Sequence, residues 1–231
     1  MTTTVVYAGV EDGYVQSVGD VEFEETYVDA RSGANLSVDT ALTYARVGQL
    51  YQSGPDLWAV REAFLGFDTS AVGTDTISAA VLNVTSSADF STTDFTIEAR
   101  LRDWGATLTT ADFVAGASLS GLTSLATKTT ASGFTAGTAY DFTDIAMPAN
   151  VNKTGTTRML LCSSRTTGNN EPTGNEYADF RAADYTGTTS DPKLTVTYAA
   201  GGSTLFLMLE DDSGAYELED DSGGILLEPG A

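Results

Sequence analysis

Histidine is absent from the 231 residues, and cysteine occurs once. The lack of histidine excludes Ser-His-Asp and Cys-His catalysis, His-ligated zinc and an imidazole proton shuttle. Cys162 cannot form a disulfide within the chain, and its apolar neighbours predict a small buried side chain. We therefore expect a non-enzymatic protein with no catalytic, cofactor-binding or metal-binding residue, although carboxylate catalysis and a structural calcium ion stay chemically open.

Basic residues are also few, because 11 Lys and Arg stand against 32 Asp and Glu, for a formal net charge of -21. Phosphate contacts need clustered Lys and Arg, and the sequence shows no such cluster, so nucleic acid is not an expected partner. The excess of negative charge is typical of a soluble, self-repelling chain.

Long hydrophobic runs are missing as well. No segment approaches the roughly 18 apolar residues of a membrane span, so no membrane partner is expected. Residues 1–6 lack the basic region and apolar segment of a secretory signal. We expect a chain that is made in a cytoplasm and stays soluble.

The sequence is rich in strand patterns instead. Residues 58–68 alternate, with Ala63, Leu65 and Phe67 on one parity, and a second apolar run at 79–84 follows an acidic turn. We expect these two strands at the middle of an all-β, antiparallel jelly-roll β-sandwich spanning residues 1–199. Further strands are expected at 5–7, 13–15, 94–101, 159–163, 177–181 and 194–198, the last closing the sandwich.

Helices and long loops are rare in this prediction. Residues 109–114 are the one helical candidate, a short turn capped by Thr110, and residues 30–35 are turn material. Residues 164–176 form a long polar loop, which either carries function or is a variable surface loop.

An acidic group near the N-terminus, Asp20, Glu22, Glu24 and Glu25, has two interpretations. Charges that alternate with apolar residues are typical of a solvated edge strand. The same carboxylates could instead bind calcium.

Three aromatic residues are candidate glycan contacts. Tyr51 and Trp58 flank the loop at residues 52–56, and Trp104 follows the strand at 94–101. Aromatic rings beside a loop can stack on sugars, but they serve more often in core or rim packing.

The last part of the chain is a repeat. Residues 200–203 have linker composition, and the acidic tail at 204–231 contains Leu-Glu-Asp-Asp-Ser-Gly at 209–214 and again at 218–223. A truncated third copy begins at Leu227, again after nine residues. Asp-Ser-Gly between apolar runs is hairpin-turn chemistry, so the tail is predicted to be a small C-terminal β-meander.

The body resembles the DNRLRE type of carbohydrate-module-like jelly roll. The residues that carry this resemblance are Arg61, Leu65, Phe67, Asp68 and Ser70, together with residues 80–84 and 192–198. The resemblance implies an antiparallel sandwich used for attachment or surface display, without catalysis.

The tail resembles the C-terminal repeats of tailed-bacteriophage virion proteins. This resemblance implies a non-enzymatic virion structural protein, and we expect a capsid decoration or cement protein, trimeric, that binds itself and the major capsid protein in the virion. The alternative is a tail-fibre, baseplate or other glycan-binding module for attachment to the host surface. A carboxylate-based glycosidase is a third class, for which no pair of acidic residues is fixed by the sequence.

Association is predicted to use the apolar residues of the tail, whose burial would oppose the repulsion between its acidic side chains. The expected contact residues are Phe206, Leu209, Tyr216, Leu218, Ile225 and Leu227.

Overall fold

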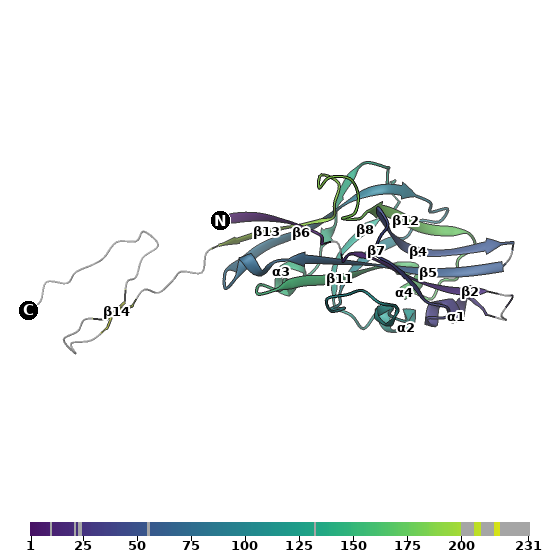
Figure 1. Ribbon diagram of the computed structural model, residues 1–231, viewed down its shortest axis with the longest axis horizontal. Helices are drawn as coiled ribbons and strands as arrows, with labels where there is room; N and C mark the ends of the chain where they lie inside the picture. Colours follow the sequence, from purple (N-terminus) through teal and green to yellow (C-terminus); the bar gives the residue numbers. More distant parts are fainter. Residues whose placement is uncertain are drawn as a thin grey trace, which may run out of the picture.

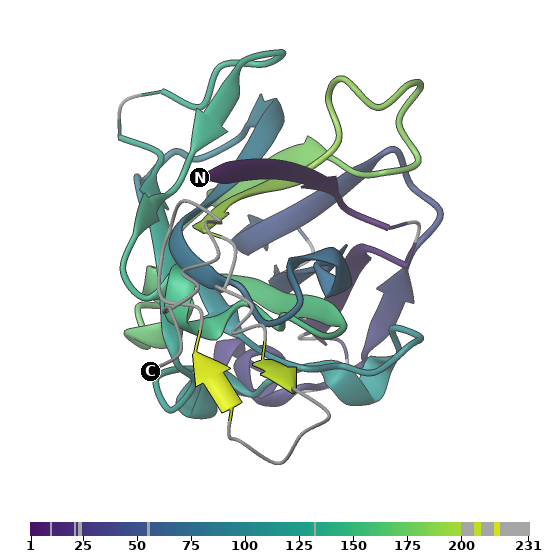
Figure 2. The same cartoon turned by 90° about the vertical axis from the view of Figure 1, so that its left-hand side faces the viewer.

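Antiparallel strands make up most of the structure, a computed structural model that describes residues 1–9, 11–20, 22, 25–54, 56–131, 133–199, 206–208 and 215–217. Strands form a large sheet that curls around a central core (Figure 2). The path of paired strands runs β1-β13-β6-β12-β4-β5-β11-β7-β8-β10, with β2, β3 and β9 pairing beside it. The expected all-β class is confirmed.

The strands of this sheet are β1 (Thr2–Tyr7), β2 (Gly13–Asp20), β3 (Ser37–Asp39), β4 (Tyr44–Ser53), β5 (Asp56–Asp68), β6 (Thr76–Asp89), β7 (Thr96–Leu101), β8 (Ser124–Thr129), β9 (Ala139–Asp141), β10 (Thr143–Asp144), β11 (Thr156–Ser163), β12 (Asn175–Arg181) and β13 (Lys193–Ala199). Short helices connect them: α1 (Tyr27–Ser32), α2 (Gly116–Leu119), α3 (Met147–Asn150) and α4 (Ser164–Thr167), with 3-10 turns η2 (Ser70–Val72) and η3 (Thr110–Asp112).

Strand β5 is buried on both faces. Ala63, Leu65 and Phe67 enter the main core, as their alternation predicts. Phe64 points the other way and packs with Trp104 under an outer layer that includes α2. Figure 1 shows α1 and α2 lying together on one side of the sheet. Because the outer layer buries the second face of β5, most residues of this strand are buried and apolar residues stand on both of its faces.

The two strands predicted as a central pair do not pair with each other. Strand β5 bonds to β2, β4 and β11, whereas β6 bonds to β9, β12 and β13. Residues 69–75, predicted as an acidic turn, contain η2 and connect two strands that pair with different neighbours. Both strands still supply the main core, through Leu65 of β5 and Leu82 of β6.

The closing strand is confirmed. Strand β13 lies between β1 and β6, antiparallel to both, with Thr2 opposite Tyr198 and Leu194 opposite Leu82. The last residue of β13 is Ala199, the predicted end of the body.

The helix predictions need three corrections. At residues 109–114 the turn is capped by Thr109 rather than Thr110, because the hydroxyl and backbone N–H of Thr109 both donate to Asp112 Oδ2. Residues 30–35, predicted as a turn, contain the end of α1 and its Gly33 cap at φ 101°. Residues 164–176 are not one loop, since they begin with α4 and end in β12.

The tail is described at two short strands. Strand β14 (Phe206–Met208) pairs antiparallel with β15 (Ala215–Glu217), with Leu207 opposite Tyr216. This pairing agrees with the prediction of antiparallel strands on either side of the first Leu-Glu-Asp-Asp-Ser-Gly copy. The association residues Leu209, Leu218, Ile225 and Leu227 lie outside the described residues, and only the backbone is described for Phe206 and Tyr216.

Candidate functional site

Tyr51 and Trp58 lie opposite each other where β4 turns into β5. Their ring centroids are 5.3 Å apart with an interplanar angle of 34°. The Tyr51 hydroxyl donates to Asp56 Oδ1 at 2.5 Å, and this hydrogen bond raises the pKa of Tyr51. Trp58 also packs against the small buried cluster of Tyr27, Ala30 and Val60. The predicted rim packing is therefore observed for Trp58, and sugar stacking by its half-buried ring beside Tyr51 stays a prediction.

A hollow of about 340 Å³ opens against this aromatic pair. Its other walls come from the loop that connects α4 to β12, at Glu171, Pro172 and Thr173. Glu171 is its one charged lining side chain among the described residues, and we name it the Glu171 hollow. An aromatic wall beside a polar loop is a common arrangement for binding a small polar ligand.

A second hollow, of about 750 Å³, adjoins the first and shares Tyr51 and Thr173 with it. Its charged lining residue is Arg61 of β5, and we name it the Arg61 hollow. The other lining side chains that carry hydroxyl or amide groups are Tyr51, Gln52, Ser53, Thr92, Thr173, Asn175 and Tyr177. Donors and acceptors of this kind match the hydroxyl groups of sugars.

A buried polar network holds the loop that walls both hollows. Glu176 is fully buried, and its Oε2 accepts hydrogen bonds from Gln49 Nε2 at 2.7 Å and from Arg165 Nε at 2.5 Å. Gln49 Nε2 also donates to the carbonyl of Asn170 at 2.6 Å. Because Gln49 and Glu176 lie on neighbouring strands β4 and β12, this network fixes the loop against the sheet before any ligand arrives.

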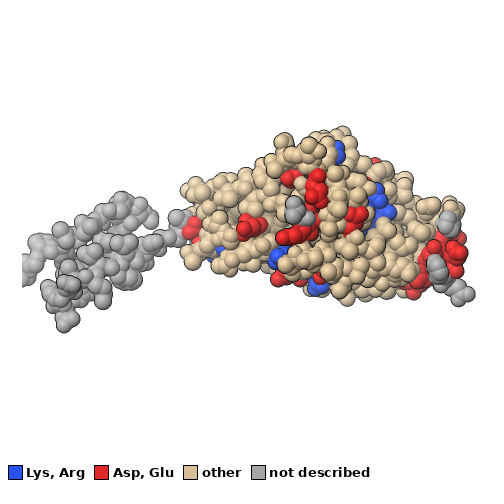
Figure 3. All heavy atoms as spheres, viewed as in Figure 1, with Lys and Arg blue, Asp and Glu red and all other residues tan. Residues whose placement is uncertain are grey.

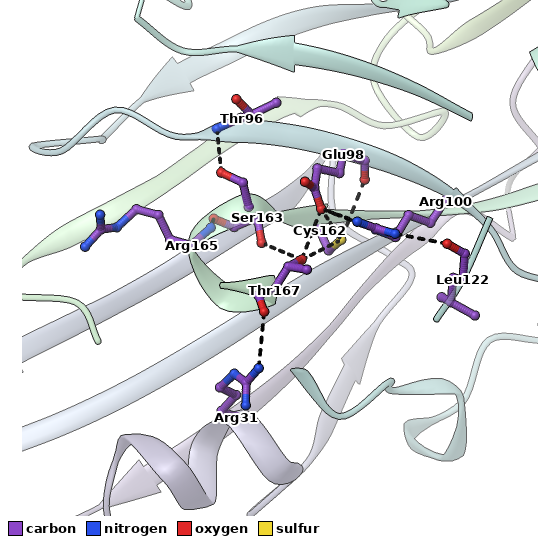
Figure 4. A network of polar contacts seen from close by, with 10 residues as sticks. Arg31, Thr96, Glu98, Arg100, Leu122, Cys162, Ser163, Arg165 and Thr167 are labelled. Atoms are coloured by element: carbon purple, nitrogen blue, oxygen red, sulfur yellow. Dashed lines mark hydrogen bonds and ion pairs between the residues drawn. The ribbon is translucent and has the colours of Figure 1, made fainter. Parts of the chain in front are cut away.

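A second network anchors α4, where that loop begins (Figure 4). Thr167 donates to Glu98 Oε2 at 3.0 Å, and Arg100 Nη2 contacts the same oxygen at 2.8 Å. From the other side, Arg31 Nε of α1 donates to the carbonyl of Thr166 at 2.8 Å. The start of the loop is therefore tied to β7 and to α1.

Cys162 lies beside this second network, as Figure 4 shows, but it has no features of a nucleophile. The thiol is buried, as predicted, and burial together with the nearby Glu62 and Glu98 raises its pKa to about 12. A thiol with so high a pKa is almost entirely protonated near neutral pH. The protonated thiol instead acts as a weak donor to the backbone carbonyl of Glu98 at 3.7 Å.

The third aromatic candidate, Trp104, lies elsewhere. It is 4% exposed, meets Phe64 edge-on at 6.4 Å, and has the Arg158 guanidinium 5.3 Å above its ring. A ring enclosed in this way has no free face for a sugar, so Trp104 is corrected from a candidate contact to a core residue.

Acidic side chains near the end of β2 accept hydrogen bonds from backbone N–H groups of the same segment. Glu25 Oε2 accepts from the backbone N–H of Asp20, and Asp20 Oδ1 accepts from the backbone N–H of Glu22. Glu24 lies outside the described residues. In the part of the chain that the structure describes, no group of three or more His, Cys, Asp or Glu residues could hold a metal ion.

The sequence analysis did not predict the burial of two carboxylates, Asp12 and Glu62. Glu62 is fully buried, with Oε2 accepting from the backbone N–H of Val114 at 2.9 Å, and burial raises its pKa well above the ordinary value. Asp12 is 1% exposed, and burial raises its pKa to about 7 despite a hydrogen bond from the backbone of Ala183. A charged residue at a buried strand position was the available signal for Glu62 and for its neighbour Arg61.

Most of the surface seen in Figure 3 is uncharged, and acidic side chains gather at the end of the body where β2 ends and β4 turns into β5. The basic Arg61 hollow is therefore an exception within a strongly acidic protein. Among the helices of the described part, none has the length and apolar character needed to cross a membrane.

Comparisons with models of protein families and with curated proteins each found no match to this chain. A fold of this class hosts many activities, so the function has to be inferred from the chemistry of the site.

Proposed function

We propose that this chain is a non-enzymatic glycan-binding module that serves attachment to a host surface. The observation that carries the proposal is the Tyr51–Trp58 pair at the edge of two adjoining hollows. Aromatic rings stack on the apolar faces of sugars, while hydroxyl and amide groups around them bind sugar hydroxyls. The buried network around Glu176 keeps this arrangement pre-formed, which lowers the entropy cost of binding.

A glycan array probed with the full chain tests this function. We expect a defined set of glycans to bind, and we expect Tyr51→Ala to weaken that binding at least about tenfold, because one ring face is removed. Tyr7→Ala is the matched control, since Tyr7 is 43% exposed on β1 and lines neither hollow. An array without binders, or equal binding by both variants, would count against the proposal.

The virion context is a proposal that rests on the tail. The strands β14 and β15, which precede the first and the second copy of the repeat, pair with each other as the predicted hairpin requires. The virion role itself is carried by the resemblance of the repeat sequence. On this basis the second candidate function is a capsid decoration or cement protein, homotrimeric, bound to the major capsid protein.

Rebinding distinguishes this second candidate. A decoration protein should rebind to particles stripped of it and restore their resistance to heating, because added interface area stabilises the shell. The same chain truncated after Ser203 should lose both its oligomeric state and its rebinding. Failure of the full chain to rebind would exclude the capsid role and leave glycan attachment.

A further inference from the structure

Arg61 is a buried cation without an ion-pair partner among the residues that the structure describes. It is 7% exposed, its Nε donates to Gln16 Oε1 at 2.7 Å, and its Nη1 is buried without a hydrogen-bond partner among the described residues. None of the four ion pairs found in the described part of the chain involves Arg61. A buried charge or donor that lacks a partner is energetically costly, so this arrangement calls for a functional explanation.

Gly48 helps to bring the Tyr177 ring close to this guanidinium. Gly48 of β4 pairs with Arg61 on one side and with Tyr177 on the other. It has φ 130°, and a side chain there would meet the Tyr177 Cβ at 2.8 Å. Glycine at this position therefore lets β4 and β12 pair closely, and across this pairing the guanidinium of Arg61 lies 4.5 Å from the Tyr177 ring centroid. Phe90 stacks on Tyr177 at 4.9 Å and steadies that ring.

The charges around Arg61 leave a local positive excess. Arg46 lies 5.7 Å from the centroid of the same Tyr177 ring, and Asp179 pairs with Arg46 at 3.1 Å. Two guanidinium groups therefore share one carboxylate. Burial, and secondly the charge of Arg46, lower the pKa of Arg61, but an arginine stays charged at neutral pH. Among the described residues that line the hollow, none is acidic.

From this arrangement we propose that the Arg61 hollow binds the carboxylate of an acidic sugar, such as a uronic acid or a sialic acid. A carboxylate can pair with the guanidinium through a charge-assisted hydrogen bond to Nη2, because Nε already donates to Gln16 and Nη1 is buried. The hollow supplies hydroxyl and amide groups for the rest of the sugar ring. This inference rests on the proposed glycan-binding function and names its ligand class. Arg61 is the residue that determines specificity, while Tyr51 contributes to affinity for any sugar.

The test uses matched pairs of oligosaccharides, each an acid and its methyl ester, that contain galacturonate, glucuronate or N-acetylneuraminate. Calorimetric titration of the full chain should give at least about tenfold tighter binding of the acid than of the ester in one pair, the usual size of a charge-assisted hydrogen bond. Arg61→Gln should remove this preference and leave the affinity for the ester unchanged. Thermal unfolding checks that the variant is folded.

Arg158→Gln is the matched control, because it removes the same charge at a residue that lines neither hollow. It should keep the preference for the acid. If Arg61→Gln fails to fold, Arg61→Lys replaces it, since a lysine keeps the charge but cannot both donate to Gln16 as Arg61 Nε does and reach the ligand as Nη2 does, so it should lower the preference.

Equal binding of acid and ester in every pair, or a preference that survives the change at Arg61, overturns the inference. If neutral glycans bind and acids bind no better, the proposed function stands and this inference fails. If no glycan binds at all, both fail.

Discussion

Two arginines near the same loop differ in how their charge is balanced. Arg165 pairs with the fully buried Glu176, and Gln49 completes a network within the protein. Arg61, two strands away, has a glutamine and a tyrosine ring for neighbours and lines an open hollow. The first arrangement pairs the charge of Arg165 with a carboxylate of the protein and serves the fold, although Glu176 Oε1 is buried without a hydrogen-bond partner among the described residues. The second leaves the charge of Arg61 without a carboxylate among the described residues, which is what a site for an anionic ligand requires.

A buried carboxylate can avoid an unpaired charge in a third way, which arginine cannot use. Asp12 and Glu62 are buried, and their pKa values are raised mainly by burial, so they can become neutral by taking up a proton. An arginine does not lose its proton within the physiological range. Its charge must therefore be paired by the protein, as for Arg165, or by a ligand, as we propose for Arg61.

The largest expected effect comes from removing Glu176 from the network that it forms with Arg165 and Gln49. Glu176→Ala removes the acceptor for Arg165 and for Gln49, and we expect a loss of about 3–5 kcal/mol in the free energy of unfolding. Urea denaturation measures it. Glu171→Ala is the control, because Glu171 is an exposed residue of the same loop, and it should change stability by less than about 0.5 kcal/mol. A similar stability for both variants would show that the network does not hold the loop.

The next effect is the pH dependence of Asp12. Its folded pKa of about 7 lies above the unfolded value, so the folded state binds the proton more tightly. Stability from this group is present below pH 4 and is lost as the pH rises through 7, by on the order of 2–4 kcal/mol. Asp12→Asn should reduce this slope between pH 4 and 8 and make the variant the more stable protein at pH 8. Parallel stability curves for the two proteins would contradict a raised pKa.

A smaller effect is expected for the unfolding of Arg61→Gln without ligand. Because Arg61 has no carboxylate partner, its loss should cost less than about 1 kcal/mol, chiefly the stacking on Tyr177. Urea denaturation beside Glu176→Ala gives the comparison directly. A loss as large as that of Glu176→Ala would make Arg61 a structural residue and remove the contrast between the two arginines.

The smallest effect is expected from removing the tail. A chain truncated after Ser203 should unfold within about 1 °C of the full chain, because β13 already closes the sandwich and both arginine sites lie within residues 1–199. Differential scanning calorimetry measures the midpoint. A truncated chain that fails to fold would show that the body depends on the tail.

The candidate site was only partly predictable from the sequence. Tyr51 and Trp58 were found because aromatic rings beside a short turn lie opposite each other in a hairpin register. Trp104 has the same chemical character and is buried, because segments far apart in the chain enclose it. Arg61 entered the sequence analysis through a family resemblance, and its meaning depends on Gly48 and Tyr177, which are distant in sequence and adjacent across three strands.

By itself the sequence determined the β class, through alternation along residues 58–68 and 194–198, and it determined the burial of Cys162 through its apolar neighbours. Local patterns report such properties because side chains on a strand alternate between two faces. The tertiary structure alone decided that β5 and β6 belong to different pairings, that Glu62 is buried, and that Arg165 is paired while Arg61 is not. Pairing and burial depend on contacts between residues far apart in the chain, and a single sequence does not list those contacts.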